Sequence, residues 1–160
     1  MAAPAHKRIA PFTATSPTEN ALNQSLREAE VASIMTQSVI CVTRSWTLRA
    51  LLLLLADGDM GGVPVVDDGW RAVGIVSKSD VVRYVSQFGV PEGATVADVM
   101  LPMAMTVKPS MPIARVAALM ACEGIHRLPV CGPAGDIVGI VTTLDIARWI
   151  AKAAGYGMAA

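Results

Sequence analysis

Two short stretches place a hydroxyl three residues before a carboxylate: Ser77 before Asp80, and Thr142 before Asp145. At the start of a helix this spacing predicts a capping box, in which each side chain accepts a hydrogen bond from the backbone amide of the other residue. The same groups also suit a nucleoside phosphate. A carboxylate can accept bonds from two ribose hydroxyls, and a hydroxyl at a helix N-terminus can bind phosphate. The two interpretations are compatible, and the residues alone leave both open.

A second candidate for anion binding is the pair His126 and Arg127. A guanidinium fork matches two phosphate oxygens, and an imidazole adds positive charge as the pH falls. A solvated or ion-paired surface arginine is the alternative for Arg127, and a structural role is favoured for His126. Gly61 and Gly62 stand 65 residues earlier and contribute no charge, so that place is either a lost site or a widened one, for which Lys78 could supply the charge.

Other kinds of site are not indicated. The sequence suggests no serine–histidine–aspartate or cysteine–histidine arrangement and contains no glycine-rich phosphate loop. Asp67 and Asp68 precede a glycine, which is ordinary turn composition rather than a metal site. We therefore predict neither catalytic residues nor a metal, and we expect a protein that is not an enzyme. The end of the chain at residue 160, with no room for a catalytic domain, points the same way.

The composition limits the partners and the compartment. Thirteen basic residues balance thirteen acidic ones, so there is no net field to gather nucleic acid or anionic lipid. The longest apolar run, residues 50–56, is far shorter than the roughly 20 residues that span a bilayer. Three cysteines are too few for a disulfide framework and indicate buried thiols in a reducing environment. We expect a cytoplasmic protein that binds neither nucleic acid nor membrane.

An internal repeat positions the two hydroxyl–carboxylate motifs. A shift of 65 residues aligns residues 31–84 with residues 96–149 without a gap, and 15 of the 54 positions are identical. Average composition would give roughly four identities. The chain therefore contains two copies of one unit. We predict a flexible tail at residues 1–24, a first repeat at residues 25–90 and a second repeat at residues 91–155.

Each copy predicts the element order β-α-β-β-α, which gives an α/β fold of the α+β kind. Ser45 and Ser110 are expected to cap the first helix of each copy, and Gly58 and Gly124 to end it. The last helix of each copy follows the hydroxyl–carboxylate motif. Strands are predicted at residues 40–42, 63–66, 73–76, 105–107, 128–131 and 137–141. The first helices are predicted at residues 48–57 and 113–123.

Five consecutive leucines, residues 51–55, indicate a subunit interface. A helix that is apolar all round is buried on every side. In so small a unit one face can meet its own sheet, while the opposite face needs a second subunit. We predict a homodimer packed through the helices that contain residues 51–55 and 116–122. The alternative is that the surplus leucines pack against the other copy or the N-terminal segment.

The doubled pattern resembles a tandem pair of CBS domains, the modules named for cystathionine β-synthase. The resemblance covers about residues 28–153 and rests on two in-phase motifs. These motifs are VPVVDD at 63–68 with VGIVS at 73–77 and Asp80, and LPV at 128–130 with IVGIVT at 137–142 and Asp145. The resemblance implies two units related by a pseudo-two-fold axis, dimerisation, and adenosine-containing ligands bound in the clefts between units.

The resemblance also implies roles for individual residues. Asp80 and Asp145 would hold ribose, with Ser77 and Thr142 beside the sugar or phosphate. The pair at 126–127 is similar to the His-Arg pair in the nucleotide-binding gamma subunit of AMP-activated protein kinase. Apolar residues would enclose adenine, and for each of them a simple core position is the alternative. These residues are Ile40, Val63, Pro64, Met105, Leu128 and Pro129.

The sequence thus predicts a regulatory module rather than an enzyme. AMP, ADP or ATP would be its regulatory ligand, with no required cofactor. Binding would rearrange the repeats or the dimer, and an unidentified partner protein would respond to that change. The alternative is a ligand-free interaction or dimerisation module whose pockets are vestigial.

Overall fold

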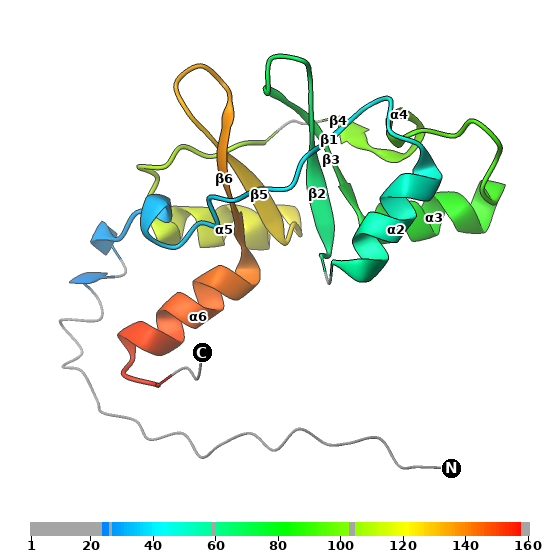
Figure 1. Cartoon of the computed structure of the whole chain (residues 1–160). Coiled ribbons are helices and arrows are strands. Elements are labelled where there is room, and N and C mark those ends of the chain that lie inside the picture. Colours follow the sequence, from blue (N-terminus) through cyan, green and yellow to red (C-terminus); the bar gives the residue numbers. More distant parts are fainter. Residues whose placement is uncertain (1–23, 26, 59, 103–104, 158–160) are drawn as a thin grey trace, which may run out of the picture.

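A computed structural model describes residues 24–25, 27–58, 60–102 and 105–157, and it contains two similar halves that lie side by side (Figure 1). All but the last residue of the predicted tail lies outside the described residues. The first sequence repeat contains η1 (Val31–Ser33), β1 (Val42–Thr43), α2 (Leu48–Asp57), β2 (Gly62–Val66), β3 (Ala72–Ser77) and α3 (Lys78–Phe88). The second sequence repeat contains α4 (Val96–Val99), β4 (Leu101–Pro102), α5 (Ile113–Glu123), β5 (Arg127–Cys131), β6 (Ile137–Thr142) and α6 (Thr143–Ala153).

This arrangement confirms the predicted mixed fold with two repeats. Each half is built on an antiparallel hairpin, β2–β3 in the first and β5–β6 in the second. β1 pairs with β2 in parallel and β4 pairs with β3 in antiparallel, so the larger sheet has the order β1-β2-β3-β4. Helices α2 and α5 have the predicted bounds, and Gly58 and Gly124 end them as expected.

The tips of the two hairpins lie next to each other (Figure 1). Arg71 in the first hairpin forms an antiparallel bridge with Asp136 in the second. Asp67 stabilises its own turn, because its Oδ1 accepts bonds of 2.9 Å from the amides of Gly69 and Arg71. The prediction that this acidic stretch forms a turn is therefore confirmed.

The predicted strands at residues 40–42 and 105–107 are too long. Of the first range only Val42 lies in β1, and of the second only Val107 forms a bridge, to Val130 of β5. Ile40 and Cys41 lie outside the sheet because the chain crosses between the two halves before Val42 (Figure 1), and Met105 and Thr106 also lie outside the strands. The sequence pattern marked the apolar residues correctly but not this crossing.

The predicted caps of the first helices are wrong. The N-cap of α2 is Thr47, whose hydroxyl accepts a helix amide over 3.2 Å, whereas the Ser45 hydroxyl pairs with that of Thr43 over 3.1 Å. The N-cap of α5 is Pro112 rather than Ser110, and it forms no side-chain cap. In both copies a tight turn after the strand uses the serine position, so the helix begins later.

Each half contributes its leading segment to the core of the other half. Val31 is fully buried in the core of the second half, and Val96 is fully buried in the core of the first. The backbone bonds repeat as well: the Val31 amide donates to the Met111 carbonyl over 3.0 Å, and the Val96 amide donates to the Trp46 carbonyl over 2.8 Å. A two-fold relation between the repeats produces this reciprocal exchange.

The residues that follow each leading segment cross in the same way. Leu101 of β4 pairs with Ile75 of β3, and at the equivalent place Thr36 pairs with Ile140 of β6 through two bonds of 2.9 Å. The boundary between residues 90 and 91 stays a prediction about the sequence repeat. The packing joins each hairpin to the leading segment of the other repeat.

The leucine-rich helix α2 is not buried on every side. Leu51 and Leu55 are buried in the first core, whereas Leu53 is 61% exposed. The expectation of buried thiols holds only for Cys131, because Cys41 is half-buried and Cys122 is exposed on α5. Burial raises the pKa of the Cys41 and Cys131 thiols. In the part of the chain that the structure describes, no helix is long and apolar enough to cross a membrane.

The crossing of β4 onto β3 requires a glycine at position 74. A methyl group at Gly74 would lie 2.9 Å from the Leu101 carbonyl oxygen of β4. We expect Gly74→Ala to lower the free energy of unfolding by about 1–3 kcal/mol, because β4 must move away, and urea denaturation would measure this loss. Gly69→Ala is the control, since its methyl group would meet only Asp67 Oδ1, at 3.4 Å. Equal stability of the two variants would contradict the close approach of β3 and β4.

Candidate functional site

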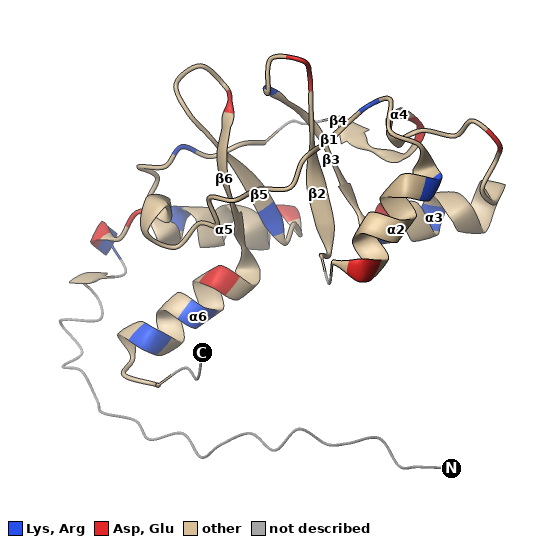
Figure 2. Cartoon of the chain, in the orientation of Figure 1, with Lys and Arg blue, Asp and Glu red and all other residues tan. Residues whose placement is uncertain are grey.

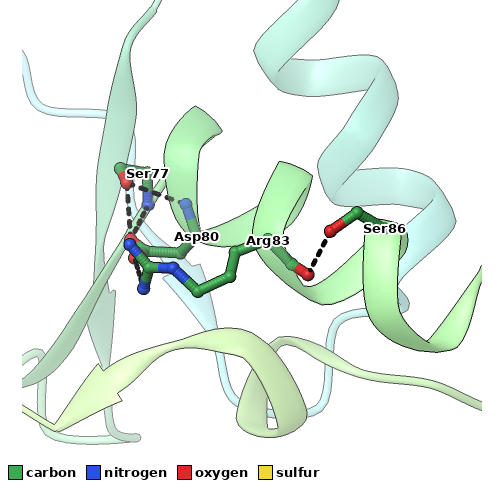
Figure 3. Close-up of polar contacts among 4 residues, drawn as sticks. All are labelled: Ser77, Asp80, Arg83 and Ser86. Atoms are coloured by element: carbon green, nitrogen blue, oxygen red, sulfur yellow. Dashed lines mark hydrogen bonds and ion pairs between the residues drawn. The ribbon is translucent and has the colours of Figure 1, made fainter.

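The two hydroxyl–carboxylate motifs form capping boxes at strand-to-helix junctions, as predicted. Ser77 ends β3 and caps α3: its Oγ accepts from the Asp80 amide over 3.2 Å, and Asp80 Oδ2 accepts from the Ser77 amide over 2.9 Å (Figure 3). Thr142 and Asp145 repeat these bonds at the start of α6, with distances of 3.2 and 2.8 Å. The hairpin strand and the helix after it are therefore joined by one side-chain pair in each repeat.

The hydroxyl groups of these motifs are already engaged. Ser77 Oγ donates to Asp80 Oδ2 over 2.5 Å, and Thr142 Oγ1 donates to Asp145 Oδ2 over 2.6 Å. A hydroxyl has one hydrogen to donate. A phosphate contact through either hydroxyl therefore requires that its bond to the carboxylate breaks, and in the structure each hydroxyl holds the carboxylate in place.

The second oxygen of each carboxylate is less engaged. Asp80 Oδ1 lies 3.5 Å from Arg83 Nη1 (Figure 3), in the only ion pair among the residues that the structure describes. The Arg83 side chain is 71% exposed, so this contact contributes little to stability. Asp145 has no ion-pair partner in the described ranges. Each Oδ1 can therefore accept a hydrogen bond from a ligand without loss of the capping box.

One cleft lies between the first repeat and β6 of the second, and we call it cleft A. It has a volume of about 400 Å³ and mainly apolar walls. Its lining residues are Thr36, Ser38, Val39, Ile40, Met60, Gly61, Gly62, Val63, Pro64, His126, Arg127, Ile140, Thr142, Thr143 and Leu144.

The equivalent place on the other side of the pseudo-two-fold axis holds cleft B. It consists of two hollows of about 340 and 180 Å³ that share Ile75, Leu101, Ile125 and Arg127. The larger hollow also contains Gly61, Ser77, Ser79, Asp80, Gly124 and His126. The smaller hollow also contains Pro102, Met105, Glu123, Leu128 and Pro129.

Most of the predicted site residues line these clefts. Cleft A brings together one predicted set: Ile40, Val63, Pro64, His126, Arg127 and Thr142. Cleft B brings together the other: Ser77, Asp80, Met105, His126, Arg127, Leu128 and Pro129. Lys78 and Asp145 are not among the lining residues. Lys78 is exposed at the start of α3, and Asp145 is held behind Thr142 by its capping bonds.

Arg127 lies between the two clefts. It is the only charged residue in the strands that the structure describes, and one basic segment is visible on β5 (Figure 2). Its Nη1 donates to the Gly62 carbonyl over 3.0 Å, and burial lowers the pKa of the guanidinium. No carboxylate in the described ranges forms an ion pair with it. Arg127 is therefore a half-buried cation without a counter-ion, not an ion-paired surface arginine.

Gly61 and Gly62 have a role that the sequence did not reveal. A methyl group at Gly61 would overlap Arg127 Nη2, and one at Gly62 would lie 2.6 Å from the Val76 carbonyl oxygen. Gly61 therefore leaves room for the arginine of the other repeat, whereas Gly62 permits the close approach of β2 and β3. The alignment of these glycines with His126 and Arg127 indicated that the first repeat lacks two large side chains. It did not indicate which side chain lies beside Gly61.

Sequence reasoning also missed the cleft residues that come from the crossing segments. Thr36 and Ser38 line cleft A, and Leu101 and Pro102 line cleft B. These residues lie outside the hairpin motifs, and the 65-residue alignment pairs Thr36 with Leu101, which share no chemistry. No group of three or more potential metal ligands occurs in the described part of the chain.

Comparison with known proteins identifies the repeated unit. The family model described as CBS domain matches residues 31–87 and again residues 96–152. The chain belongs to the CBS domain family. The predicted resemblance is therefore confirmed, and the two matches contain the two aligned copies at residues 31–84 and 96–149.

A solved structure has the same CBS pair arrangement. The CBS-pair protein CBSX2 of Arabidopsis thaliana, in complex with AMP, superposes with a TM-score of 0.68 at 29% identity, covering 77% of this chain and 96% of that one.

The curated relatives are longer proteins. An uncharacterized protein of Methanopyrus kandleri is 29% identical over 122 residues, which are 76% of this chain and 62% of the relative. An inosine-5'-monophosphate dehydrogenase of Nitrosopumilus maritimus is 27% identical over 124 residues, which are 78% of this chain and 25% of the enzyme. The chain thus spans less than two thirds of the length of these relatives.

The capping boxes of this CBS pair can be tested through stability. Ser77→Ala removes the acceptor for the Asp80 amide, so we expect the free energy of unfolding to fall by about 1 kcal/mol in urea denaturation. Ser79→Ala is the matched control, because Ser79 is exposed two residues further along the same helix. If the two variants lose the same stability, Ser77 does not act as a cap.

Proposed function

We propose that this CBS pair is a regulatory module that binds an adenosine-containing ligand, with AMP, ADP or ATP as the expected nucleotide. One observation carries the proposal: the half-buried Arg127 guanidinium, without a counter-ion, faces two clefts. A partly desolvated cation is costly unless an anion or several acceptors compensate it. A phosphate group would satisfy this need through two parallel bonds.

The apolar walls of the clefts support a purine as the uncharged part of the ligand. In cleft A these walls come from Ile40, Val63 and Pro64, and Ile40 is 51% exposed next to β1. In cleft B they come from Met105, Leu128 and Pro129. Small-molecule sites are typically apolar hollows with a few polar anchors. A flat base enclosed by these side chains would leave its polar edge beside backbone groups.

The carboxylates would bind the ribose. Asp80 lines cleft B, and its Oδ2 is fixed by Ser77, so Oδ1 would accept a ribose hydroxyl. Asp145 would serve cleft A in the same way after a small movement past Thr142. The complex of CBSX2 with AMP supports this ligand class, because that protein shares the fold and 29% of the aligned residues.

Signalling would follow from the exchange of leading segments. Cleft A is walled by both repeats, so a ligand that fills it would favour one relative orientation of the repeats over others. A partner protein could respond to that orientation, and no catalytic role is assigned to the chain itself. The free cysteines support the proposed cytoplasmic location.

A ligand-free interaction module is the competing function, and nucleotide titration distinguishes the two. Calorimetry with AMP, ADP, ATP, NAD and S-adenosylmethionine should detect binding of at least one ligand. For the best ligand, Asp80→Ala should weaken binding at least about tenfold, because hydrogen bonds to a charged group contribute about 1.5–3 kcal/mol.

Asp98→Ala is the matched control for that titration. Asp98 forms a capping box with Thr95 on α4, and it is not among the residues that line either cleft. Its loss should leave affinity unchanged. Asp80→Asn keeps a cap acceptor and guards against unfolding of the alanine variant. No binding at millimolar ligand would remove the nucleotide proposal, and equal affinity of all variants would remove Asp80 and cleft B from the proposed site.

We also propose that the module is a homodimer that packs through its helices. Leu53 on α2 and Val82 on α3 are 61% and 67% exposed. An apolar hollow of about 280 Å³ lies between α5 and α6, beside Met120 and Ile146. Exposed apolar surfaces of this kind mark subunit interfaces. The side chain of Leu53, which is exposed in the single chain, would be buried against a second copy.

Sedimentation equilibrium tests the proposed dimer. The wild-type protein should have twice the mass of one chain, and Leu53→Glu should shift it toward the monomer because a charge would be buried in the interface. Asp68→Lys, in the exposed turn of the first hairpin, changes the charge elsewhere and should leave the dimer intact. A monomeric wild-type protein, or a dimeric Leu53→Glu variant, would contradict the proposal.

A further inference from the structure

Arg127 is positioned to serve both clefts with one guanidinium. It lines cleft A and both hollows of cleft B. Its Nη1 is tied to the Gly62 carbonyl over 3.0 Å, and its Nη2 occupies the space beside Gly61. Gly61 itself lines cleft A and the larger hollow of cleft B. The guanidinium therefore lies at the wall that separates the two clefts.

The first repeat has no arginine to complete a symmetric pair. The residue equivalent to Arg127 is Gly62, and a side chain there would begin 2.6 Å from the Val76 carbonyl oxygen. The backbone at that position excludes any larger residue, so the absence of a second guanidinium is built into the strand pairing of β2 with β3. The two clefts thus have one half-buried arginine between them.

One guanidinium cannot neutralise two phosphates equally well. A phosphate bound in one cleft would accept hydrogen bonds from the guanidinium and neutralise its positive charge. A second phosphate in the other cleft would then find these donors already bonded. It would also be repelled by the first phosphate, because like charges repel strongly at a partly buried position. An uncharged nucleoside would not meet this obstacle.

We propose that the two clefts share Arg127, so that each chain binds one phosphate-bearing nucleotide tightly and a second at least tenfold more weakly, while the second cleft remains open to an uncharged nucleoside. This inference rests on the proposed nucleotide-binding function. It makes the two clefts of a pseudo-symmetric module unequal through a single side chain.

Titration calorimetry with AMP and adenosine tests the sharing. For the wild-type protein we expect one tight AMP per chain, a second step at least tenfold weaker, and one equivalent of adenosine bound to AMP-saturated protein. In Arg127→Met the ratio of the two AMP dissociation constants should fall below threefold, because neither cleft then has the arginine. Gly61→Ala should also lower this ratio, since its methyl group displaces the flexible end of the arginine and leaves the backbone in place.

Arg71→Met is the matched control, because it removes one arginine at the exposed hairpin tip and should preserve the wild-type ratio. Thermal unfolding of each variant checks that it is folded. If Arg127→Met does not fold, the Gly61→Ala variant tests the sharing of Arg127 by itself. Two AMP molecules bound per chain within threefold in affinity, or no adenosine bound to AMP-saturated protein, would overturn the sharing and leave the proposed function standing. Absence of AMP binding would overturn the sharing, and the proposed function would be overturned with it if ADP, ATP, NAD and S-adenosylmethionine also failed to bind.

Discussion

The exchange of leading segments between the two repeats is the constraint on which the rest of the structure depends. Val31 completes the core of the second half and Val96 completes the core of the first, so neither hairpin has a closed core without the other repeat. The segments that follow, at Thr36 and at Leu101, pair with the outer strand of the opposite hairpin. Thr36 lines cleft A and Leu101 lines cleft B, so the exchange of segments that completes the two cores also forms the clefts.

Within this symmetric backbone, side chains make the two clefts different. The capping boxes are repeated with nearly equal distances, which shows that the duplicated junction is under the same structural demand in both halves. Around them, Asp80 lines its cleft while Asp145 is not among the lining residues, and the half-buried guanidinium of Arg127 comes from β5. A module of this kind can keep one fold and still distinguish its two sites, because the backbone bonds that define the fold do not involve those side chains.

Much of the architecture was predictable because it depends on local chemistry. The helices α2 and α5, their terminal glycines, the two hairpins and the capping boxes follow from apolar periodicity and from residues whose effect acts within a few positions. The wrong predictions concern residues whose structure depends on contacts outside their own element. Residues 40–42 have strand composition, yet only Val42 joins the sheet, because the preceding Thr36 is bound to β6. Ser45 has cap chemistry, but the turn before α2 uses it and Thr47 becomes the cap.

The sequence by itself determined that the chain is a doubled unit with one acid at each strand-to-helix junction, because a repeat and a three-residue spacing are properties of the linear chain. Only the tertiary structure decided which repeat completes which core, and that the Arg127 side chain lies beside Gly61 and donates to the Gly62 carbonyl. The reason is that these contacts join positions distant in the chain. Their geometry is set by the packing of two hairpins against each other, and no local pattern records it.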